Sequence, residues 1–426
     1  MQILVLGGGG REHALSWAIA RSPRCSQVFC VPGNGGTQAV APSFPLDVTD
    51  HRAVVAACEA RSIDLVVVGP EQPLVDGLAD ALRAAGIAVF GPDAAPAQLE
   101  GSKSFAKEFM ARHGIPTAAY DVFDDGEALI AHLASCPVPV VVKADGLAGG
   151  KGVLICMDRA EAVAAGQAMA REHRFGAAGA RVVVEEFMEG EEASLLALVD
   201  GETVVVLPPL QDHKRRFDGD EGPNTGGMGA YSPVPAMTQG LIDQAVREVL
   251  EPAARGLVAD GTPYRGVLYA GLMLTSTGPR VVEFNCRFGD PECQPLILAL
   301  TSDLLPLLDA TARGVLADQP LPSVRDGAVC CVVMVSGGYP GSYPKGMTIS
   351  GIPVDDEDVV VFHAGTRLDE GDLVTSGGRV LGVTARGDSF AQARSRAYDV
   401  VRMIQWEGAA FREDIGWRAL QGETTQ

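Results

Sequence analysis

Short apolar runs that alternate with helical patterns constrain the fold of the first hundred residues more than any other feature of this chain. The apolar runs predict buried strands at residues 3–6, 28–31 and 64–69. The helical patterns between and after them cover residues 11–21, 51–61 and 73–85. Such alternation implies a parallel sheet with right-handed crossovers. Ligands bind these sheets at the carboxyl ends of the strands, so functional residues are expected there.

The rest of the chain follows other patterns. Its 426 residues are too many for one compact core and indicate about two to four domains. After residue 102 a strand at 138–143 opens a glycine-rich loop, and 208–235 is a long polar segment with little periodicity. Strands are expected again at 328–335, 359–364 and 379–386. We therefore expect a multidomain α/β protein, with a parallel α/β domain at 1–102, an α+β domain at 103–327 and a small α+β domain at 328–426.

Composition excludes several classes of protein. The formal net charge of −20 argues against a protein that grips a nucleic-acid backbone, although a local basic pocket can still hold phosphate. The nine cysteines lack Cys-x-x-Cys spacing, which argues against a disulfide framework or a zinc ribbon. No basic leader precedes the first strand, and no apolar run reaches the ~18 residues that span a bilayer. We expect a cytoplasmic protein that binds neither nucleic acid nor membranes.

A first glycine run, Gly7 to Gly10, follows the first strand and opens a helix. A dinucleotide fingerprint needs a third glycine where Glu12 or His13 stands here, which argues against a nicotinamide cofactor. Bare N–H groups at a helix N-terminus still suit an anion, and Arg11 adds a cation. The alternative is a tight strand-to-helix turn that needs only the conformational freedom of glycine.

A second glycine-rich loop runs from Lys143 to Gly152 between two expected strands. It lacks the Gly-Lys-Ser/Thr ending on a helix, so it is not a P-loop. Its glycines and Lys151 could fold over phosphates as a flexible cover, and Lys143 at the end of the strand would point a second ammonium at the same charge. The alternative is a glycine-rich hairpin with a solvated lysine.

A third and a fourth stretch carry carboxylates on strands. After the strand that ends near Glu185, backbone groups could contact an adenine edge, although an acidic edge strand is commonplace. In the fourth stretch, Glu283, Asn285 and Arg287 lie two residues apart and share one face of an extended segment. Carboxylate and amide oxygens suit Mg²⁺, and the guanidinium could stabilise a transferring phosphoryl group. The alternative is an amphipathic strand that faces water.

A fifth stretch combines the basic run at 211–216 with the glycine-rich run at 222–229. It is either a solvated basic loop or the floor of a substrate pocket that orders when a ligand binds.

Taken in order, these motifs resemble the phosphoribosylamine–glycine ligase family along nearly the whole chain. The segment 287–292 (Arg-Phe-Gly-Asp-Pro-Glu) is similar to that family's signature, and 211–214 and 222–233 match as well. So do residues 7–13 and 69–71. The resemblance implies an ATP-grasp fold with a substrate-binding N-terminal domain and a lid subdomain at about 121–193. It also implies that the chain joins glycine to 5-phosphoribosylamine through glycyl phosphate, forming ADP and phosphate, and that it is a monomer.

The resemblance further implies roles for individual residues. The ATP site would comprise Lys103, Lys143, Gly146, Gly149, Gly150, Lys151, Gly152, Glu185, Glu186, Phe187, Met188 and Glu192. Glycine and phosphoribosylamine would contact Gly9, Gly10, Arg11, Glu12, His13, Glu71, Asp212, His213, Lys214, Asn224, Gly226 and Pro291. The catalytic residues would be Arg287 and Asp290, and Mg²⁺ or Mn²⁺ would be held by Glu283 and Asn285.

The chain departs from the ATP-grasp pattern in two places. The strand at 269–273 lacks the acidic metal ligand that many of these enzymes carry, which leaves the number of metal ions open. Gly149 stands where the family usually has alanine, and it should loosen the lid. Three alternatives remain: a biotin-dependent carboxylase subunit, which would lose the match at 211–233, a nicotinamide dehydrogenase, and a nucleotide-binding regulatory protein without turnover.

Overall fold

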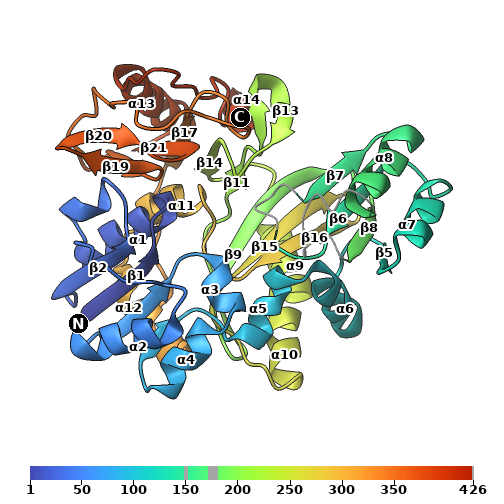
Figure 1. The fold of residues 1–426 in the computed structure, drawn as a ribbon, viewed down its shortest axis with the longest axis horizontal. Coiled ribbons are helices and arrows are strands. Elements are labelled where there is room, and N and C mark those ends of the chain that lie inside the picture. Colours follow the sequence, from blue (N-terminus) through green and yellow to red (C-terminus); the bar gives the residue numbers. More distant parts are fainter. Residues whose placement is uncertain (148–151, 171–180, 425–426) are drawn as a thin grey trace.

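A computed structural model describes residues 1–147, 152–170 and 181–424 of the chain (Figure 1). Its first part is a four-stranded parallel sheet in the order β2-β1-β3-β4. The strands are β1 (Gln2–Gly7), β2 (Gln27–Pro32), β3 (Leu65–Val68) and β4 (Ala88–Phe90). The helices are α1 (Gly10–Ala20), α2 (His51–Ala60), α3 (Glu71–Val75), α4 (Leu78–Ala84) and α5 (Ala94–Gly101). The predicted parallel sheet is confirmed.

One predicted helix of this part is wrong. The pattern over 73–85 predicts one continuous helix, whereas α3 and α4 are separate. Gly77 lies between them with φ +91°, in the left-handed region that an α-helix cannot include.

A small antiparallel sheet forms the most separate part of the molecule, on the right in Figure 1. Its order is β5-β8-β6-β7, with strands β5 (Tyr120–Phe123), β6 (Val140–Ala144), β7 (Val153–Cys156) and β8 (Val182–Glu186). Helices α7 (Gly126–Leu133) and α8 (Arg159–Ala170) cover it, and α6 (Lys103–His113) leads into it. We call β5–β8 with α7 and α8 the lid lobe. Its buried apolar residues form a cluster of their own, so the lobe does not share a core with the rest.

A third four-stranded sheet faces the lid lobe from the centre of the molecule. Its order is β10-β9-β15-β16, from β9 (Glu191–Asp200), β10 (Thr203–Val206), β15 (Arg265–Thr275) and β16 (Gly278–Asn285). Strands β15 and β16 pair antiparallel as a hairpin. The helices of this part are α9 (Gln239–Ala245), α10 (Glu251–Ala259), α11 (Cys293–Ala299) and α12 (Leu304–Arg313).

A five-stranded antiparallel sheet, ordered β11-β14-β17-β21-β18, forms most of the last part. Its strands are β11 (Gln211–Asp212), β14 (Gly229–Ser232), β17 (Ala328–Val335), β18 (Val359–His363) and β21 (Arg379–Gly387). Two small hairpins accompany it, β12 (Arg215–Phe217) with β13 (Glu221–Asn224) and β19 (Thr366–Asp369) with β20 (Asp372–Thr375). Helices α13 (Phe390–Met403) and α14 (Trp417–Thr424) complete it. Strands β11 and β14 therefore bring the long polar segment into the sheet of the C-terminal residues.

Two apolar clusters join the N-terminal sheet to the central sheet, and one of them continues into β17 and β18. The N-terminal, central and C-terminal parts are thus packed together, and the first turn of α1 and the segment after β16 meet among them (Figure 1). Within the described ranges, no helix has the length and apolar character that crossing a bilayer requires.

Candidate active site

The lid lobe and the central sheet meet at a buried pair of lysines. The Lys143 Nζ at the end of β6 donates to the carbonyl of Val282 on β16, at 3.2 Å. The carboxylate of Glu185 on β8 lies 2.9 Å from Lys143 Nζ and 3.0 Å from Lys107 Nζ, and all three side chains are buried. Burial lowers the pKa of Lys107 to about 8, although Glu185 opposes the shift. Burial away from water thus holds the ammonium groups of Lys107 and Lys143 in place beside the carboxylate of Glu185.

Lys107 is a functional candidate that the sequence analysis missed. It lies four residues after Lys103 on α6, and residues with this spacing share one helix face. This spacing is the feature of the sequence from which Lys107 could have been identified.

The predicted phosphate-binding lysines and the predicted metal ligand approach one another. Burial lowers the pKa of Lys103, which also interacts electrostatically with Glu283 and Lys143. Its Nζ lies 3.4 Å from the carbonyl oxygen of Gly146. At the other end of the loop the Gly152 carbonyl accepts from the N–H of Ala144, at 2.8 Å. Three predicted residues, Gly149, Gly150 and Lys151, lie outside the described residues.

The residues predicted to contact adenine and ribose lie at the end of β8, at the start of β9 and in the turn that joins them. Glu186 pairs with Arg280 at 2.9 Å and accepts from the Ala119 N–H at 3.0 Å, so its carboxylate is already engaged. Phe187 is half-buried and Met188 is buried. At the start of β9, the ammonium of Lys214 forms an ion pair with Glu192 and holds the pKa of that carboxyl below its ordinary value.

The end of β16 carries the predicted metal and phosphoryl-transfer residues. Arg287 Nη2 lies 2.8 Å from Glu100 and donates to the Asn285 Oδ1 at 3.2 Å, while its Nε contacts Glu71 at 3.3 Å. Burial alone would lower the Arg287 pKa, but Glu100 and Glu71 raise it, so the guanidinium stays charged. Glu100 was not predicted, because it reaches this site from α5, far away in sequence.

The donor set at Glu283 and Asn285 fits a magnesium-like ion. Within the part of the chain that the structure describes, the Glu283 carboxylate makes no hydrogen bond or ion pair, so both its oxygens can accept a ligand. No cluster of three or more His, Cys, Asp or Glu side chains suited to a metal is found among those residues. Mg²⁺ needs no such cluster, because it commonly takes one or two carboxylates together with substrate phosphates and water.

Alternation along the extended segment that begins with β11 divides the residues predicted at 212–214. Asp212 and Lys214 lie on one face, 3.9 Å apart, with Glu192 next to the lysine. Burial raises the pKa of Asp212 to about 7, with Lys214 opposing the shift and Glu292 adding to it. Glu292 itself accepts a 2.6 Å hydrogen bond from the hydroxyl of Tyr269. Neither Glu292 nor Tyr269 was among the predicted site residues.

The structure does not bring His213 to this group. Its side chain lies on the opposite face of the extended segment, where it is buried and its Nε2 accepts from the N–H of Gly416 at 2.8 Å. Asp220 lies 3.6 Å from its Nδ1. These contacts tie β11 to the C-terminal segment.

The first glycine run forms a capped helix start. The Glu12 carboxylate accepts from the N–H of Gly9 at 2.6 Å and from Arg11 Nε at 2.6 Å. Arg11 also donates to the carbonyl of Phe288 at 2.9 Å, which fixes this turn against the segment after β16. A Cβ on Gly10 would lie 2.4 Å from the amide nitrogen of Gln294, so a larger residue there would displace that side chain.

His13 packs against the C-terminal part. Its Nδ1 accepts from the N–H of His363 at 2.8 Å, and its ring contacts those of Phe362 and His363. Burial lowers the pKa of His13 to about 3, and that of His363 to about 4.

A cavity of about 310 Å³ opens where the N-terminal turn, the segment after β16 and the C-terminal part meet. Its lining includes Gly8, Gly9, Asn34, Asp290, Thr366 and Arg379. Burial would raise the Asp290 pKa, but Arg379 and Arg11 hold it below its ordinary value. Arg379 and Asn34 were missed, since neither belongs to a recognisable motif.

Of the remaining predicted residues, Gly226 and Pro291 lie near this cavity, and Asn224 lies in a hairpin. Arg379 donates to the carbonyl oxygens of Gly226 and Asp290, so one guanidinium joins the two predicted loops. A Cβ on Gly227 would lie 2.3 Å from Pro291, which explains the glycine beside Gly226. Asn224 pairs with Arg215 in the β12–β13 hairpin and is half-buried.

Comparison with known proteins gives matches along the whole chain. Models of phosphoribosylglycinamide synthetase match in order: the N domain at residues 1–100, the ATP-grasp (A) domain at 101–293 and the C domain at 329–418. The phosphoribosylamine–glycine ligase of Caulobacter vibrioides is 55% identical over 423 residues, which cover 99% of each chain.

Solved structures agree with this result. The crystal structure of the phosphoribosylamine–glycine ligase of Thermotoga maritima is similar with a TM-score of 0.87 at 34% identity, covering 98% of this chain and 100% of that one. The biotin carboxylase domain of the Hydrogenobacter thermophilus 2-oxoglutarate carboxylase has a TM-score of 0.72 at 18% identity over 96% of this chain and 91% of its own, which is a likeness of fold alone. The chain belongs to the phosphoribosylglycinamide synthetase family.

Proposed function

We propose that this protein is an ATP-dependent ligase that joins glycine to 5-phosphoribosylamine, the second step of de novo purine synthesis. The glycine carboxylate attacks the γ-phosphate of ATP, giving glycyl phosphate and ADP. The amine of phosphoribosylamine then attacks the acyl carbon and displaces phosphate, leaving glycinamide ribonucleotide. Relatives of nearly the same length, more than half identical to this chain, carry the name of this activity, which supports the assignment.

One observation carries the mechanism: lysines at the edge of the lid lobe lie close to oxygen donors of the central sheet. Lys143 contacts β16 directly, and Lys103 interacts with Glu283. A triphosphate bound there would be held by cations on one side and by a metal site on the other. We assign Lys103 and Lys143 to the phosphates, together with Gly146, Gly152 and the lid residues 149–151, and residues 185–188 with Glu192 to adenosine.

Glu283 and Asn285 would hold Mg²⁺ or Mn²⁺, which would neutralise charge on the phosphates. The accessible carboxylate of Glu283 supports this role. Arg287 hydrogen-bonds to Asn285 and stays charged, so it is placed to stabilise the negative charge that builds up on the phosphoryl group during transfer.

Phosphoribosylamine and glycine are assigned to the space between Asp212 and the 310 Å³ cavity. Arg379 supplies a cation there, and the polypeptide backbone at Gly8 and Gly9 permits a close approach. Asp290 with Pro291, Gly226 and Lys214 complete this half of the proposed site. Because acyl phosphates hydrolyse, the lid lobe over the phosphates would protect the intermediate from water.

The nicotinamide dehydrogenase alternative finds no support in this geometry. A pyrophosphate needs bare N–H groups at the helix start, but the Glu12 carboxylate already occupies the N–H of Gly9. The cytoplasmic location, the monomeric state and the boundaries at 102 and 327 remain predictions.

A phosphate-release assay tests the proposed function. The protein with ATP, Mg²⁺ and glycine should release phosphate rapidly only after freshly made phosphoribosylamine is added. A parallel assay replaces the two substrates with bicarbonate and biotin, and no turnover is expected there. Turnover with bicarbonate and biotin, or none with the amine, would exclude the assignment.

A further inference from the structure

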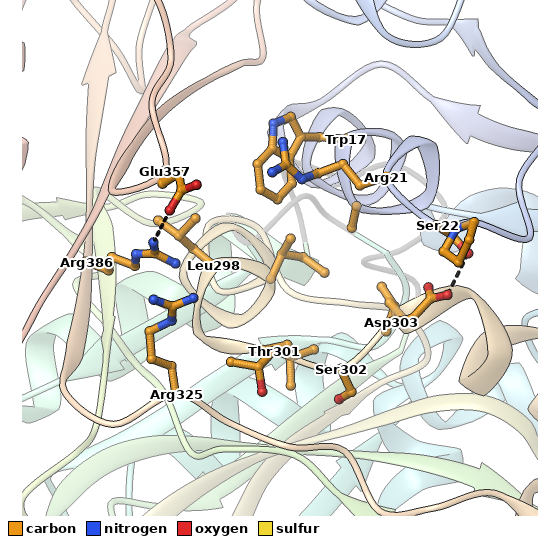
Figure 2. Close-up of a pocket in the computed structure, with 15 residues that line it drawn as sticks. Trp17, Arg21, Ser22, Leu298, Thr301, Ser302, Asp303, Arg325, Glu357 and Arg386 are labelled. Carbon is orange, nitrogen blue, oxygen red and sulfur yellow. Dashed lines mark hydrogen bonds and ion pairs between the residues drawn. The ribbon is translucent and has the colours of Figure 1, made fainter.

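A second cavity lies at the far end of the helices that begin at the proposed active site (Figure 2). It measures about 400 Å³, within the range of small-molecule sites. The eleven-residue helix α1 starts at the 310 Å³ cavity and ends at Trp17–Arg21 in this one, about 16 Å away. Helix α11 follows Asp290 and likewise ends here, at Ile297 and Leu298. The second cavity is therefore separate from the substrate cavity.

Three arginines from different parts of the chain line this cavity: Arg21, Arg325 and Arg386. Figure 2 shows Arg325 and Arg386 pointing into it from the same side. Among the described residues, the Arg325 guanidinium makes no hydrogen bond or ion pair. Such guanidinium groups match the forked geometry of a phosphate, and their gathering contrasts with the net charge of −20 of the chain.

The two acids of the cavity do not satisfy these arginines. Asp303 caps α12 through the N–H of Leu305 at 3.1 Å and accepts from Ser22 at 2.7 Å. The Glu357 side chain is 90% exposed and lies 3.7 Å from Arg386, so it forms a weak ion pair that a ligand can displace. The Arg386 Nε also donates to Asp358 at 2.6 Å, so an entering anion would meet the guanidinium of Arg325 and the remaining N–H groups of Arg386.

Part of the lining is apolar and aromatic. Ile297, Leu298 and Leu300 belong to it, and Trp17 stands beside them with Arg21 over its ring at 4.4 Å from the centroid. A planar ring packs favourably against such a wall, while free phosphate would leave it uncovered.

From this combination we propose that the cavity binds a small phosphate monoester that carries a planar ring, with Arg325 and Arg386 on the phosphate and Trp17 and Leu298 beside the ring. The ligand would bridge the N-terminal and C-terminal parts of the chain.

Calorimetric titration of the full chain at fixed low ionic strength tests the proposal. The probe is uridine 5′-monophosphate, whose pyrimidine differs from the adenine of the proposed ATP site. Uridine alone and inorganic phosphate should each bind at least about tenfold more weakly, because each lacks half of the contacts. If either binds as tightly as the monophosphate, or if the monophosphate does not bind, the proposal is overturned.

Three variants locate the binding. Arg325→Ala should weaken binding of the probe by about tenfold or more, whereas Glu357→Gln should strengthen it by removing the competing carboxylate. Arg52→Ala, which removes the same charge from the surface of α2, should leave affinity unchanged. Equal affinity in wild type and Arg325→Ala would place the probe elsewhere and overturn the proposal. Phosphate release by the ligase reaction is scored separately, so the two proposals can fail independently.

Discussion

Two arginines, Arg287 and Arg412, are each held by two carboxylates, and the molecule uses them differently. The Arg412 side chain is fully buried, and its Nε and Nη2 donate to the two oxygens of Asp414 at 2.7 and 2.8 Å. Its Nη1 donates to Asp220 at 2.9 Å and to the carbonyl of Arg215 at 3.0 Å. The side chain of Arg287 remains 18% exposed, and its contacts with Glu71, Glu100 and Asn285 range from 2.8 to 3.3 Å.

An arginine held by two carboxylates can therefore serve either stability or chemistry, depending on how its N–H groups are paired. Arg412 closes a bidentate pair, which leaves little capacity for another anion and connects the β12–β13 hairpin to the C-terminal segment. Arg287 spreads its N–H groups over partners on three different elements and keeps one side open. We therefore expect that Arg287 can exchange a protein carboxylate for a substrate anion and that Arg412 cannot.

The largest expected effect is on stability. Arg412→Ala leaves Asp220 and Asp414 without their shared buried cation and should lower the free energy of unfolding by about 3–5 kcal/mol. The midpoint of urea unfolding measures it. The control Arg402→Ala removes an exposed arginine and should change stability by about 0.5 kcal/mol or less. Turnover per folded molecule should be unchanged in both, and a slower Arg412→Ala enzyme would break the comparison.

The next effect is on turnover. Arg287→Ala should raise the barrier for phosphoryl transfer by roughly 3 kcal/mol while changing ATP affinity much less, because in the proposed mechanism the guanidinium stabilises charge that develops only during transfer. Steady-state phosphate release gives kcat, and equilibrium binding gives ATP affinity. Equal losses in the two would assign Arg287 to ground-state binding. Arg287→Lys keeps the charge but loses the fork, so an intermediate rate is expected.

The two arginines also show what the sequence could predict. Alternation along β16 and beyond it predicts one face for Glu283, Asn285 and Arg287, and in the structure Arg287 donates to Asn285. Glu100 could not be predicted, because packing rather than periodicity brings α5 to Arg287. Arg379 likewise reaches Asp290 only through the assembled C-terminal sheet.

In the fold, too, the sequence predicts the elements that local patterns determine and misses those that depend on tertiary packing. The parallel N-terminal sheet could be read from its apolar strands. The segment at 208–235 was expected to have little periodicity, yet it contains β11 to β14, strands of two to four residues. Runs this short show no alternation, and β14 joins the C-terminal sheet by pairing with β17, which lies far along the chain, while β11 pairs with β14.

A smaller effect is expected on the Mg²⁺ dependence of the reaction, at Glu283, which precedes Arg287 on the same face. Glu283→Gln should weaken the response to Mg²⁺ by about tenfold, since it removes a charged oxygen from a site with few protein ligands. A titration of phosphate release against Mg²⁺ at saturating ATP measures this. Glu248→Gln, on the surface of the same part of the chain, is the control. An unchanged Mg²⁺ midpoint in Glu283→Gln would remove it from the metal site.

The smallest expected effect is on the pH dependence of stability, and it concerns His13. The sequence predicts that His13 contacts substrate, but its side chain is buried against protein groups, as that of Arg412 is. The pKa of His13 falls from 6.5 to about 3 and that of His363 to about 4, so below pH 6.5 the unfolded chain binds protons that the native chain does not. Stability is therefore complete above pH 6.5 and falls toward pH 4, by at most about 1.4 kcal/mol per pH unit for each histidine.

His13→Asn removes one of these contributions but keeps an acceptor for the N–H of His363. The slope of unfolding free energy between pH 6 and pH 4.5 should become shallower by about 1.4 kcal/mol per pH unit, measured by urea unfolding at each pH. If His13→Asn instead raised the KM for phosphoribosylamine and left the slope unchanged, His13 would belong with Arg287 on the chemical side, because a histidine that only packs has no means of altering substrate affinity selectively.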